Sequence, residues 1–294
     1  NAGLLSLVES IGVIMGANIG TTITAWLISL LGFKVKIASI ALPIIAIGFP
    51  MMFSSKSNIK AWAEVLIGFA LLFMGLDALK GSVPNLGAEE LNFLKSYADM
   101  GIMSTLIFIG VGTILTLVVQ SSSAAMALTL VMCYEGYIPF ELAAAMVLGE
   151  NIGTTITANL AALVGNVHSK RAARAHFIFN IFGVIWMIFA FQFFINSIDN
   201  YMISYMNLSP LSSVGESVAV PIGLSIFHTT FNILNVLFLV WFVPLISRTV
   251  IRMQPSKGEI DEEFHLEHIG AGLMQTTELS VLEAKKEIIK FGEI

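Results

Sequence analysis

The chain of 294 residues is 56% hydrophobic and 12% charged, with a mean hydropathy of +0.85. Soluble domains carry about 25% charged residues, so the composition excludes an ordinary soluble protein and predicts an all-α protein embedded in lipid. The net charge of -5 argues against nucleic acid as a partner, and the single cysteine, Cys133, excludes an internal disulfide or a CxxC metal pair.

Seven apolar runs follow one another along the chain, at about 4–32, 37–53, 61–80, 101–133, 137–165, 172–196 and 212–247. A helix that crosses a membrane needs about 20 residues. The runs 4–32, 101–133 and 137–165 are much longer, and each is interrupted by Ser, Thr, Asn or Gly. We therefore expect broken or re-entrant helices in these three runs, where protein or a water-filled cavity satisfies the freed backbone groups.

Two of the long runs contain near copies of one segment. The sequence GANIGTTIT at 16–24 recurs as GENIGTTIT at 149–157, and residues 16–32 match 149–165 at 12 of 17 positions. Duplicated halves in a membrane protein are typical of transporters with inverted repeats, whose site lies at the interface of the repeats. The duplication therefore predicts an inverted-repeat transporter.

The glycines of the two copies fit two interpretations. Gly16 and Gly20, like Gly149 and Gly153, form GxxxG patterns, and most such patterns only pack helices closely. Because Asn and Thr are duplicated with them, we favour a functional role over packing alone, and packing and binding can coexist. The duplicated polar residues are Asn18, Thr21 and Thr22 in the first copy, and Asn151, Thr154 and Thr155 in the second.

A second polar cluster, QSSS, lies in the middle of the run 101–133 and comprises Gln120, Ser121, Ser122 and Ser123. Four such residues facing lipid would be costly, so the cluster predicts a helix break that faces a cavity. The hydroxyl and amide groups, together with the N–H groups at a helix N-terminus, can donate to an oxyanion. Hydroxyl and carbonyl oxygens also suit a monovalent cation. A polar kink without function is the alternative.

Three further polar residues have two interpretations each. Glu150 replaces Ala17 of the first copy and would either add negative charge to a cation site or pair with a buried donor. His176 and Asn180 belong to a pattern, H-x-x-F-N, that recurs at 228–232. They would either line the cavity or, as we favour, make an interhelical hydrogen bond.

Basic residues and the C-terminal composition suggest the orientation. Lys170, Arg171 and Arg174 mark one loop, and Arg248, Arg252 and Lys257 mark the tail. Because cytoplasmic loops carry the excess of Lys and Arg, we expect a cytoplasmic C-terminus. Residues 251–275 are polar and predict a linker, and 276–294 predict a soluble amphipathic helix.

The motifs together resemble a known family. The segments QSSSAAMALTL, GENIGTTIT and RAARAHFIFN resemble the second repeat of the type II sodium-dependent phosphate cotransporters, and NAGLLSLVESIGVIMGANIGTTIT resembles the end of the first. The resemblance implies a membrane domain over 1–250, in which about 1–55 form the end of the first repeat and about 100–190 form the second repeat. It also implies that the first QSSS lies upstream of Asn1, so that the chain is N-terminally truncated. Residues 276–294 resemble the start of a PhoU-like domain.

The resemblance implies a sodium/phosphate symporter that imports phosphate across the cell membrane by alternating access, and not an enzyme. Phosphate would bind Gln120, Ser121, Ser122 and Ser123. Sodium, the coupling ion and the only metal expected, would bind beside them. The site would be lined by Asn18, Thr21, Thr22, Glu150, Asn151, Thr154 and Thr155. Helix breaks at Gly16, Gly20, Gly149 and Gly153 would place the Asn and Thr residues there. The partners would be phosphate, sodium and the lipid bilayer, with a homodimer as the oligomeric state considered.

Alternative functions come from other classes. The membrane part could sense phosphate and signal through the PhoU-like tail, or the symporter could carry another oxyanion such as arsenate or sulfate. A third alternative is an intramembrane hydrolase with Ser121 or Ser122 and His176. We do not favour it, because the sequence has no nucleophile elbow and no evident group to orient the histidine.

Overall fold

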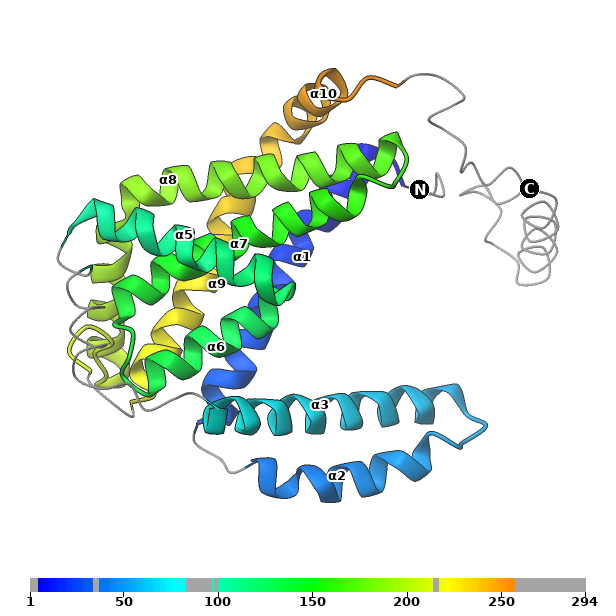
Figure 1. Ribbon diagram of the computed structural model, residues 1–294, viewed down its shortest axis with the longest axis vertical. Helices are drawn as coiled ribbons and strands as arrows, with labels where there is room; N and C mark the ends of the chain where they lie inside the picture. The colour runs from blue at the N-terminus through cyan, green and yellow to red at the C-terminus, as the bar shows by residue number, and fades with distance from the viewer. Residues whose placement is uncertain (1–4, 34–36, 83–96, 98–99, 214–216, 257–294) are drawn as a thin grey trace. The chain divides into compact units, whose positions relative to one another are not determined.

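The computed structural model describes residues 5–33, 37–82, 97, 100–213 and 217–256, which form helices and no strand (Figure 1). The fold class expected from the composition, all-α, is confirmed. The elements are α1 (Leu7–Leu27) with the π-helical turn η1 (Ile28–Gly32), α2 (Ile37–Met51), α3 (Ser57–Ser82), α5 (Ile102–Val119), α6 (Ser122–Tyr134), α7 (Phe140–Ala162), α8 (Val167–Met206), α9 (Ala219–Leu239) with the 3-10 turn η2 (Val240–Phe242), and α10 (Val243–Met253).

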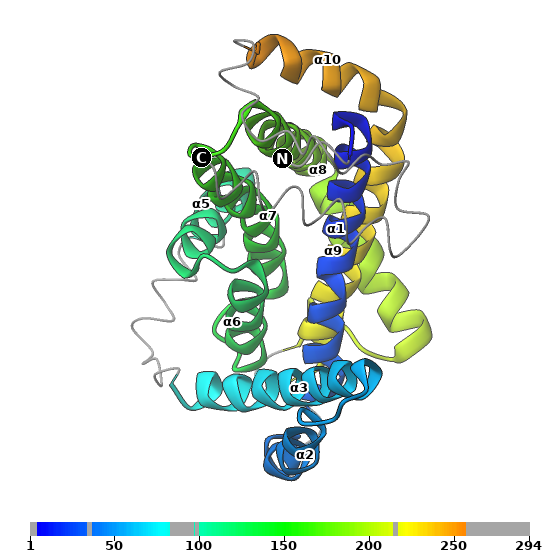
Figure 2. The ribbon, with the colours of Figure 1, turned by 90° about the vertical axis from the view of Figure 1, so that its right-hand side faces the viewer.

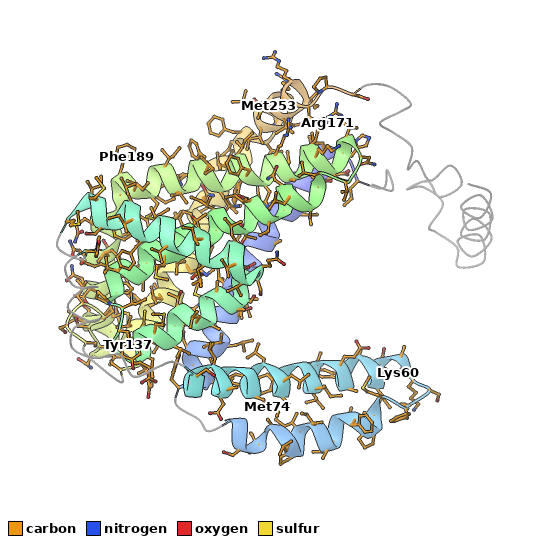
Figure 3. The ribbon with its side chains drawn as sticks, viewed as in Figure 1. Lys60, Met74, Tyr137, Arg171, Phe189 and Met253 are labelled. Atoms are coloured by element: carbon orange, nitrogen blue, oxygen red, sulfur yellow. The ribbon has the colours of Figure 1, made fainter. Side chains whose placement is uncertain are left out.

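Within the described ranges, five helical segments are long and apolar enough to cross a membrane: Leu7–Gly32, Ser57–Ser82, Ile102–Val119, Val167–Met206 and Ala219–Met253. Many of their large apolar side chains face outward. Phe189 of α8, for example, is 86% exposed and projects from the helix (Figure 3). A surface of this kind is stable in lipid and not in water, so the protein is an integral membrane protein.

The described residues belong to two compact units. Unit 1 comprises the described residues within Asn1–Asn18, Thr155–Gly183 and Leu234–Ile294, and unit 2 comprises those within Ile19–Thr154 and Val184–Ile233. The core of unit 1 is built around Ile11, Phe179 and Val250. The core of unit 2 is larger and includes fully buried Phe140, Phe227, Phe231, Leu130 and Leu148. In unit 2, α2 and α3 lie side by side as a hairpin (Figure 1).

The long run 101–133 is broken as expected, whereas the other two long runs are not. The break lies between α5 and α6 at Gln120 and Ser121. The helix α1 continues through Gly16 and Gly20, and α7 continues through Gly149 and Gly153, so the breaks expected at these four glycines were wrong. The polar residues beside them require no break because they bond to their own helix. Asn151 Nδ2, for example, donates to Val147 O at 2.8 Å.

The glycines of the second copy instead allow α7 to cross α5 at backbone distance; both views show the two helices side by side (Figures 1 and 2). A Cβ on Gly149 would lie 2.0 Å from Ile109 O, and a Cβ on Gly112 of α5 would lie 2.0 Å from Met146 O. A Cβ on Gly153 would lie 2.6 Å from Thr116 Cβ. The GxxxG pattern of the second copy therefore packs helices.

The first copy has a different environment. Gly16 and Gly20 of α1 are exposed, and apart from the adjacent backbone of α1 itself no described atom lies within 4 Å of the place where a Cβ would stand on either of them. At these glycines, two segments with nearly the same sequence thus differ in packing, since described atoms crowd the second copy and not the first.

The C-terminal predictions lie mostly outside the described residues. The helix α10 continues to Met253, beyond the start of the linker expected at 251–275. The remainder of that linker and the PhoU-like segment expected at 276–294 fall in residues that the structure does not describe beyond 256.

Gly149→Ala is predicted to destabilise the protein by about 1–3 kcal/mol or more, because the new methyl group would overlap the carbonyl of Ile109. Thermal unfolding of the detergent-solubilised protein, followed by tryptophan fluorescence, measures the effect. Gly110→Ala is the control, since it adds the same methyl group to α5 where no described atom lies within 4 Å. Equal unfolding midpoints for both variants would contradict the backbone crossing.

Candidate functional site

The QSSS segment forms a sharp corner between two helices of unit 2. Gln120 ends α5 in the left-handed conformation, with φ 57° and ψ 22°, and its N–H donates to Thr116 O at 2.7 Å. Ser121 is extended, with φ -147° and ψ 114°, and its Oγ caps α6 by accepting from Ala124 N at 3.3 Å. The helix therefore stops and restarts within two residues, as the polar cluster predicted.

The corner presents several hydrogen-bond donors that the fold does not consume. Gln120 and Ser121 are exposed, and Ser122 and Ser123, the first residues of α6, are half-buried. The first N–H groups of a helix have no partner within that helix, and they carry the positive end of its dipole. Ser121 Oγ accepts one bond and keeps its own proton for donation. This combination of donors suits an oxyanion.

The helix α7 supports the corner from two directions within unit 2. Thr129 of α6 donates through Oγ1 to Glu150 Oε1 at 2.7 Å, and both side chains are buried. The hydroxyl of Thr113 of α5 shares its proton between Ile109 O of its own helix at 2.8 Å and Gly149 O of α7 at 3.1 Å. Of the two roles considered for Glu150, the structure shows the second, since its carboxyl group pairs with a buried donor, the hydroxyl of Thr129. Thr129 was missed by the sequence analysis, because a single Thr in an apolar run carries no pattern.

A buried polar atom without a partner lies one turn before the corner. The Oγ1 of Thr116 has no hydrogen-bond partner in the described part of the chain, although the residue is only 1% exposed. Thr116 packs against Gly153 at the crossing of α5 and α7. Buried polar atoms are rarely left unsatisfied, so this hydroxyl is a candidate for contact with a bound ion or water. The sequence analysis did not select it.

Unit 1 contains a second set of the expected residues. Asn18 Nδ2 lies 3.2 Å from His176 Nε2, which places an interhelical hydrogen bond between α1 and α8. Asn180 is fully buried, and its Nδ2 donates to His176 O at 3.2 Å. Thr155 is also buried. The hydrogen bond from Asn18 gives His176 the structural role that the sequence analysis favoured.

The two H-x-x-F-N segments have the same local geometry. In each, the asparagine donates its Nδ2 to the carbonyl of the histidine four residues earlier, Asn180 to His176 and Asn232 to His228. Because that carbonyl can only accept, the amide orientation is determined. The Oδ1 of Asn180 and the Oδ1 of Asn232 are consequently buried without a partner in the described residues, and so is Nδ1 of His228. In the sequence, the recurrence of the H-x-x-F-N pattern is what indicated His228 and Asn232.

The remaining expected residues bond locally. Thr22 donates to Ile19 O at 2.8 Å in unit 2, and Thr154 donates to Glu150 O at 2.9 Å. Thr21 is half-buried on α1 in the same unit. Within unit 2 the structure therefore brings together the QSSS corner, Glu150 and the start of the second copy through α5, α6 and α7.

Thr129→Val is predicted to lower stability by about 1–3 kcal/mol, because it leaves the buried Glu150 carboxyl without its donor at nearly constant volume. Thermal unfolding in detergent measures the loss, and Thr129→Ser should restore most of it. Thr249→Val is a control that removes an exposed hydroxyl bonded only within its own helix. The interpretation fails if Thr129→Val unfolds at the wild-type temperature.

Comparison with known proteins identifies the family. The Na+/Pi-cotransporter family matches at residues 1–81 and 91–209, which include the QSSS corner and both copies of the repeated segment. The uncharacterized protein YqeW of Bacillus subtilis is 29% identical over 189 residues, covering 63% of this chain and 58% of YqeW. No solved structure matches the chain.

Two further relatives have names that describe transport. The Salmonella typhimurium protein named "Putative inorganic phosphate export protein YjbB" is 23% identical over 293 residues, covering 99% of this chain and 50% of that protein. The sodium-dependent phosphate transport protein 2B of Mus musculus is 36% identical over 128 residues, covering 41% of this chain and 18% of that protein. The chain spans about half the length of its bacterial relatives. With the family match covering most of the chain, the resemblance seen in its motifs is confirmed: this protein belongs to the Na+/Pi-cotransporter family, whose members are transporters and not enzymes.

Proposed function

We propose that the protein is a sodium-coupled inorganic phosphate symporter that works by alternating access. The observation that carries the proposal is the polar corner at Gln120 and Ser121, which interrupts an apolar helix inside the segment that matches the family. Irregular backbone at membrane depth is tolerated where it lines a cavity or is buried in protein, and this corner presents unused donors.

Phosphate binds at the corner in this proposal. The amide of Gln120 and the hydroxyls of Ser121, Ser122 and Ser123 donate to its oxygens, and the first N–H groups of α6 add the helix dipole. No Lys or Arg occurs in QSSS or in the repeated segments. The anion therefore needs a cation that enters with it, because burying an unpaired charge is expensive.

Sodium is that cation in the proposal. Its ligands are hydroxyl, carbonyl and carboxylate oxygens, which a hard monovalent ion prefers. Near the corner in unit 2, such oxygens are offered by Thr116 Oγ1, which has no partner among the described residues, and by the carboxyl of Glu150. The further lining residues are Asn18, Thr21, Thr22, Asn151, Thr154 and Thr155, each a source of amide or hydroxyl oxygen.

The direction of net transport has two candidates. An inward sodium gradient drives import through a symporter, which is the direction that the motifs suggested. Export is the second candidate, because the YjbB relative is named as a phosphate export protein and matches 99% of this chain. Vesicles loaded with phosphate distinguish the two: a symporter releases phosphate only when the sodium gradient points outward, whereas an uncoupled exporter releases it under either gradient.

The protein is proposed to lie in the cell membrane with the C-terminal end of α10 in the cytoplasm. In unit 1, Arg171 Nε donates to Gln254 O at 2.9 Å and Arg174 Nη1 donates to Met253 O at 2.8 Å. The start of α8 and the end of α10 therefore lie on one side of the membrane. Both carry basic residues, as cytoplasmic segments do.

Uptake of labelled phosphate into proteoliposomes, with an inward sodium gradient or with choline in its place, tests the function. We expect sodium-dependent uptake that falls about 10- to 100-fold in Gln120→Ala and in Ser121→Ala, because each loses a hydrogen bond to a charged ligand. The matched controls are Gln192→Ala and Ser197→Ala, which change exposed residues of α8. Wild-type uptake in both corner variants would refute the assigned site.

Gln120→Gly separates the backbone role of this residue from its side-chain role. A left-handed conformation costs a non-glycine residue about 1–2 kcal/mol, so glycine is predicted to raise the unfolding temperature relative to Gln120→Ala. Uptake should nevertheless be lost, because the amide is gone. Retained uptake in Gln120→Gly would mean that the corner needs only its shape and that the amide does not bind phosphate.

A further inference from the structure

A groove in unit 1, distant in sequence from the QSSS corner, has an almost entirely apolar wall. Its volume is ≈ 310 Å³, and it is formed by Ile178 and Phe182 of α8 with Phe242, Leu245, Ile246 and Thr249 of η2 and α10. The one hydroxyl in the wall is used, since Thr249 Oγ1 donates to Leu245 O at 2.9 Å. The groove therefore suits a hydrocarbon segment and offers no hydrogen bond inside.

The helix α10 is not needed to cross the membrane. The 21 residues of α9 already extend about 31 Å, which matches a hydrocarbon core of about 30 Å. The ribbon then turns through η2 and Pro244 into the 11 residues of α10 (Figure 2). Trp241, which is 83% exposed, stands at the turn, and exposed Trp residues are enriched where the membrane meets water.

The two faces of α10 differ in chemistry. Val243, Ile246 and Val250 are buried in the core of unit 1. Leu245 is exposed on the other face together with Arg248 and Arg252, which are four residues apart and so lie on the same side of the helix. Helices with this distribution lie in the membrane interface, where their basic residues attract anionic lipids.

Among the described residues, two arginines near α10 make hydrogen bonds to it and two on α10 itself have no partner. Arg171 and Arg174 of α8 bind the last carbonyls around α10, as described above, and hold its end against α8 (Figure 3 labels Arg171 and Met253). Arg248 and Arg252 have no partner within the described residues. Arg171 and Arg174 thus hold the end of α10 against α8, and these two helices form the two walls of the groove. Arg248 and Arg252 leave two positive charges on the face of α10 that carries Leu245, a residue of the groove wall.

We propose that this groove binds an anionic phospholipid, with an acyl chain between α8 and α10 and the phosphate on Arg248 and Arg252. The apolar wall selects an amphiphile over a soluble anion. The two guanidinium groups bind the lipid phosphate, and they favour an anionic lipid because the ammonium of a zwitterionic headgroup cancels the attraction. The site is separate from the proposed phosphate site, so its failure would leave the transport proposal intact.

The experiment compares dioleoyl phosphatidylglycerol with dioleoyl phosphatidylcholine, added to the purified full chain in detergent, and counts retained lipids by native mass spectrometry. We expect selective retention of phosphatidylglycerol. Arg248→Gln with Arg252→Gln should weaken it about tenfold or more, since each basic residue near a membrane contributes about a fivefold factor. Lys56→Gln with Lys60→Gln removes the same charge from exposed positions in unit 2 and should leave retention unchanged.

Leu245→Trp provides a second variant, which fills the groove and keeps both arginines. It should reduce retention of phosphatidylglycerol although the charge is unaltered, and glycerol phosphate, the headgroup alone, should not compete. Equal retention of the two lipids, full retention in the double arginine variant, or effective competition by glycerol phosphate would each overturn the proposal. Retention of neither lipid would also overturn it and would favour a protein segment as the occupant of the groove.

Discussion

The absence of water from the membrane interior governs the polar chemistry of this protein. A hydroxyl or amide on a helix in lipid must find a partner, and the nearest one is the carbonyl four residues earlier in the same helix. Asn18, Asn151, Asn180 and Asn232 all use it. An asparagine bonded in this way commits its N–H group and directs its oxygen away from the helix. In Asn180 and Asn232 that oxygen is buried and without a partner in the described residues. Self-satisfied helices can therefore still present acceptor oxygens to an ion.

At the QSSS corner, by contrast, the helix is interrupted and the polar residues shape the break. Gln120 adopts a left-handed conformation that glycine would adopt without strain, and Ser121 uses its own hydroxyl to cap the next helix. The corner depends on α7, which approaches α5 through Gly112, Gly149 and Gly153 and reaches α6 through the hydrogen bond between Thr129 and Glu150. In the proposed site the chemistry would thus rest on four polar residues, while the position of the corner rests on glycines and one buried carboxyl.

The sequence predicted those features that follow from the free-energy cost of placing a given residue type in lipid, whatever its neighbours are. Four consecutive polar residues in an apolar run have few tolerable positions, so the break at Gln120 could be predicted. Glycine has two uses in a membrane helix, breaking it or admitting a neighbour, and the pattern does not distinguish them. The breaks expected at Gly16, Gly20, Gly149 and Gly153 were wrong for that reason. Nor could the near identity of the two copies predict that one is covered and the other open, since packing depends on the neighbours. The contact of Thr129 with Glu150 joins residues 21 apart in sequence, and no local pattern indicates it.

The crossing of α5 and α7 also has a mechanical consequence. Where side chains separate two helices, rotamer changes let them slide and tilt. At Gly112 and Gly149 the backbones touch directly, with Thr113 bonded across the contact, so no side chain can reorient to accommodate a displacement. These two helices should consequently move as one stiff body, and rearrangements around the corner must be absorbed by softer joints, such as the two residues between α5 and α6. The stiffness of this helix pair would then come from glycine, the smallest residue in the chain.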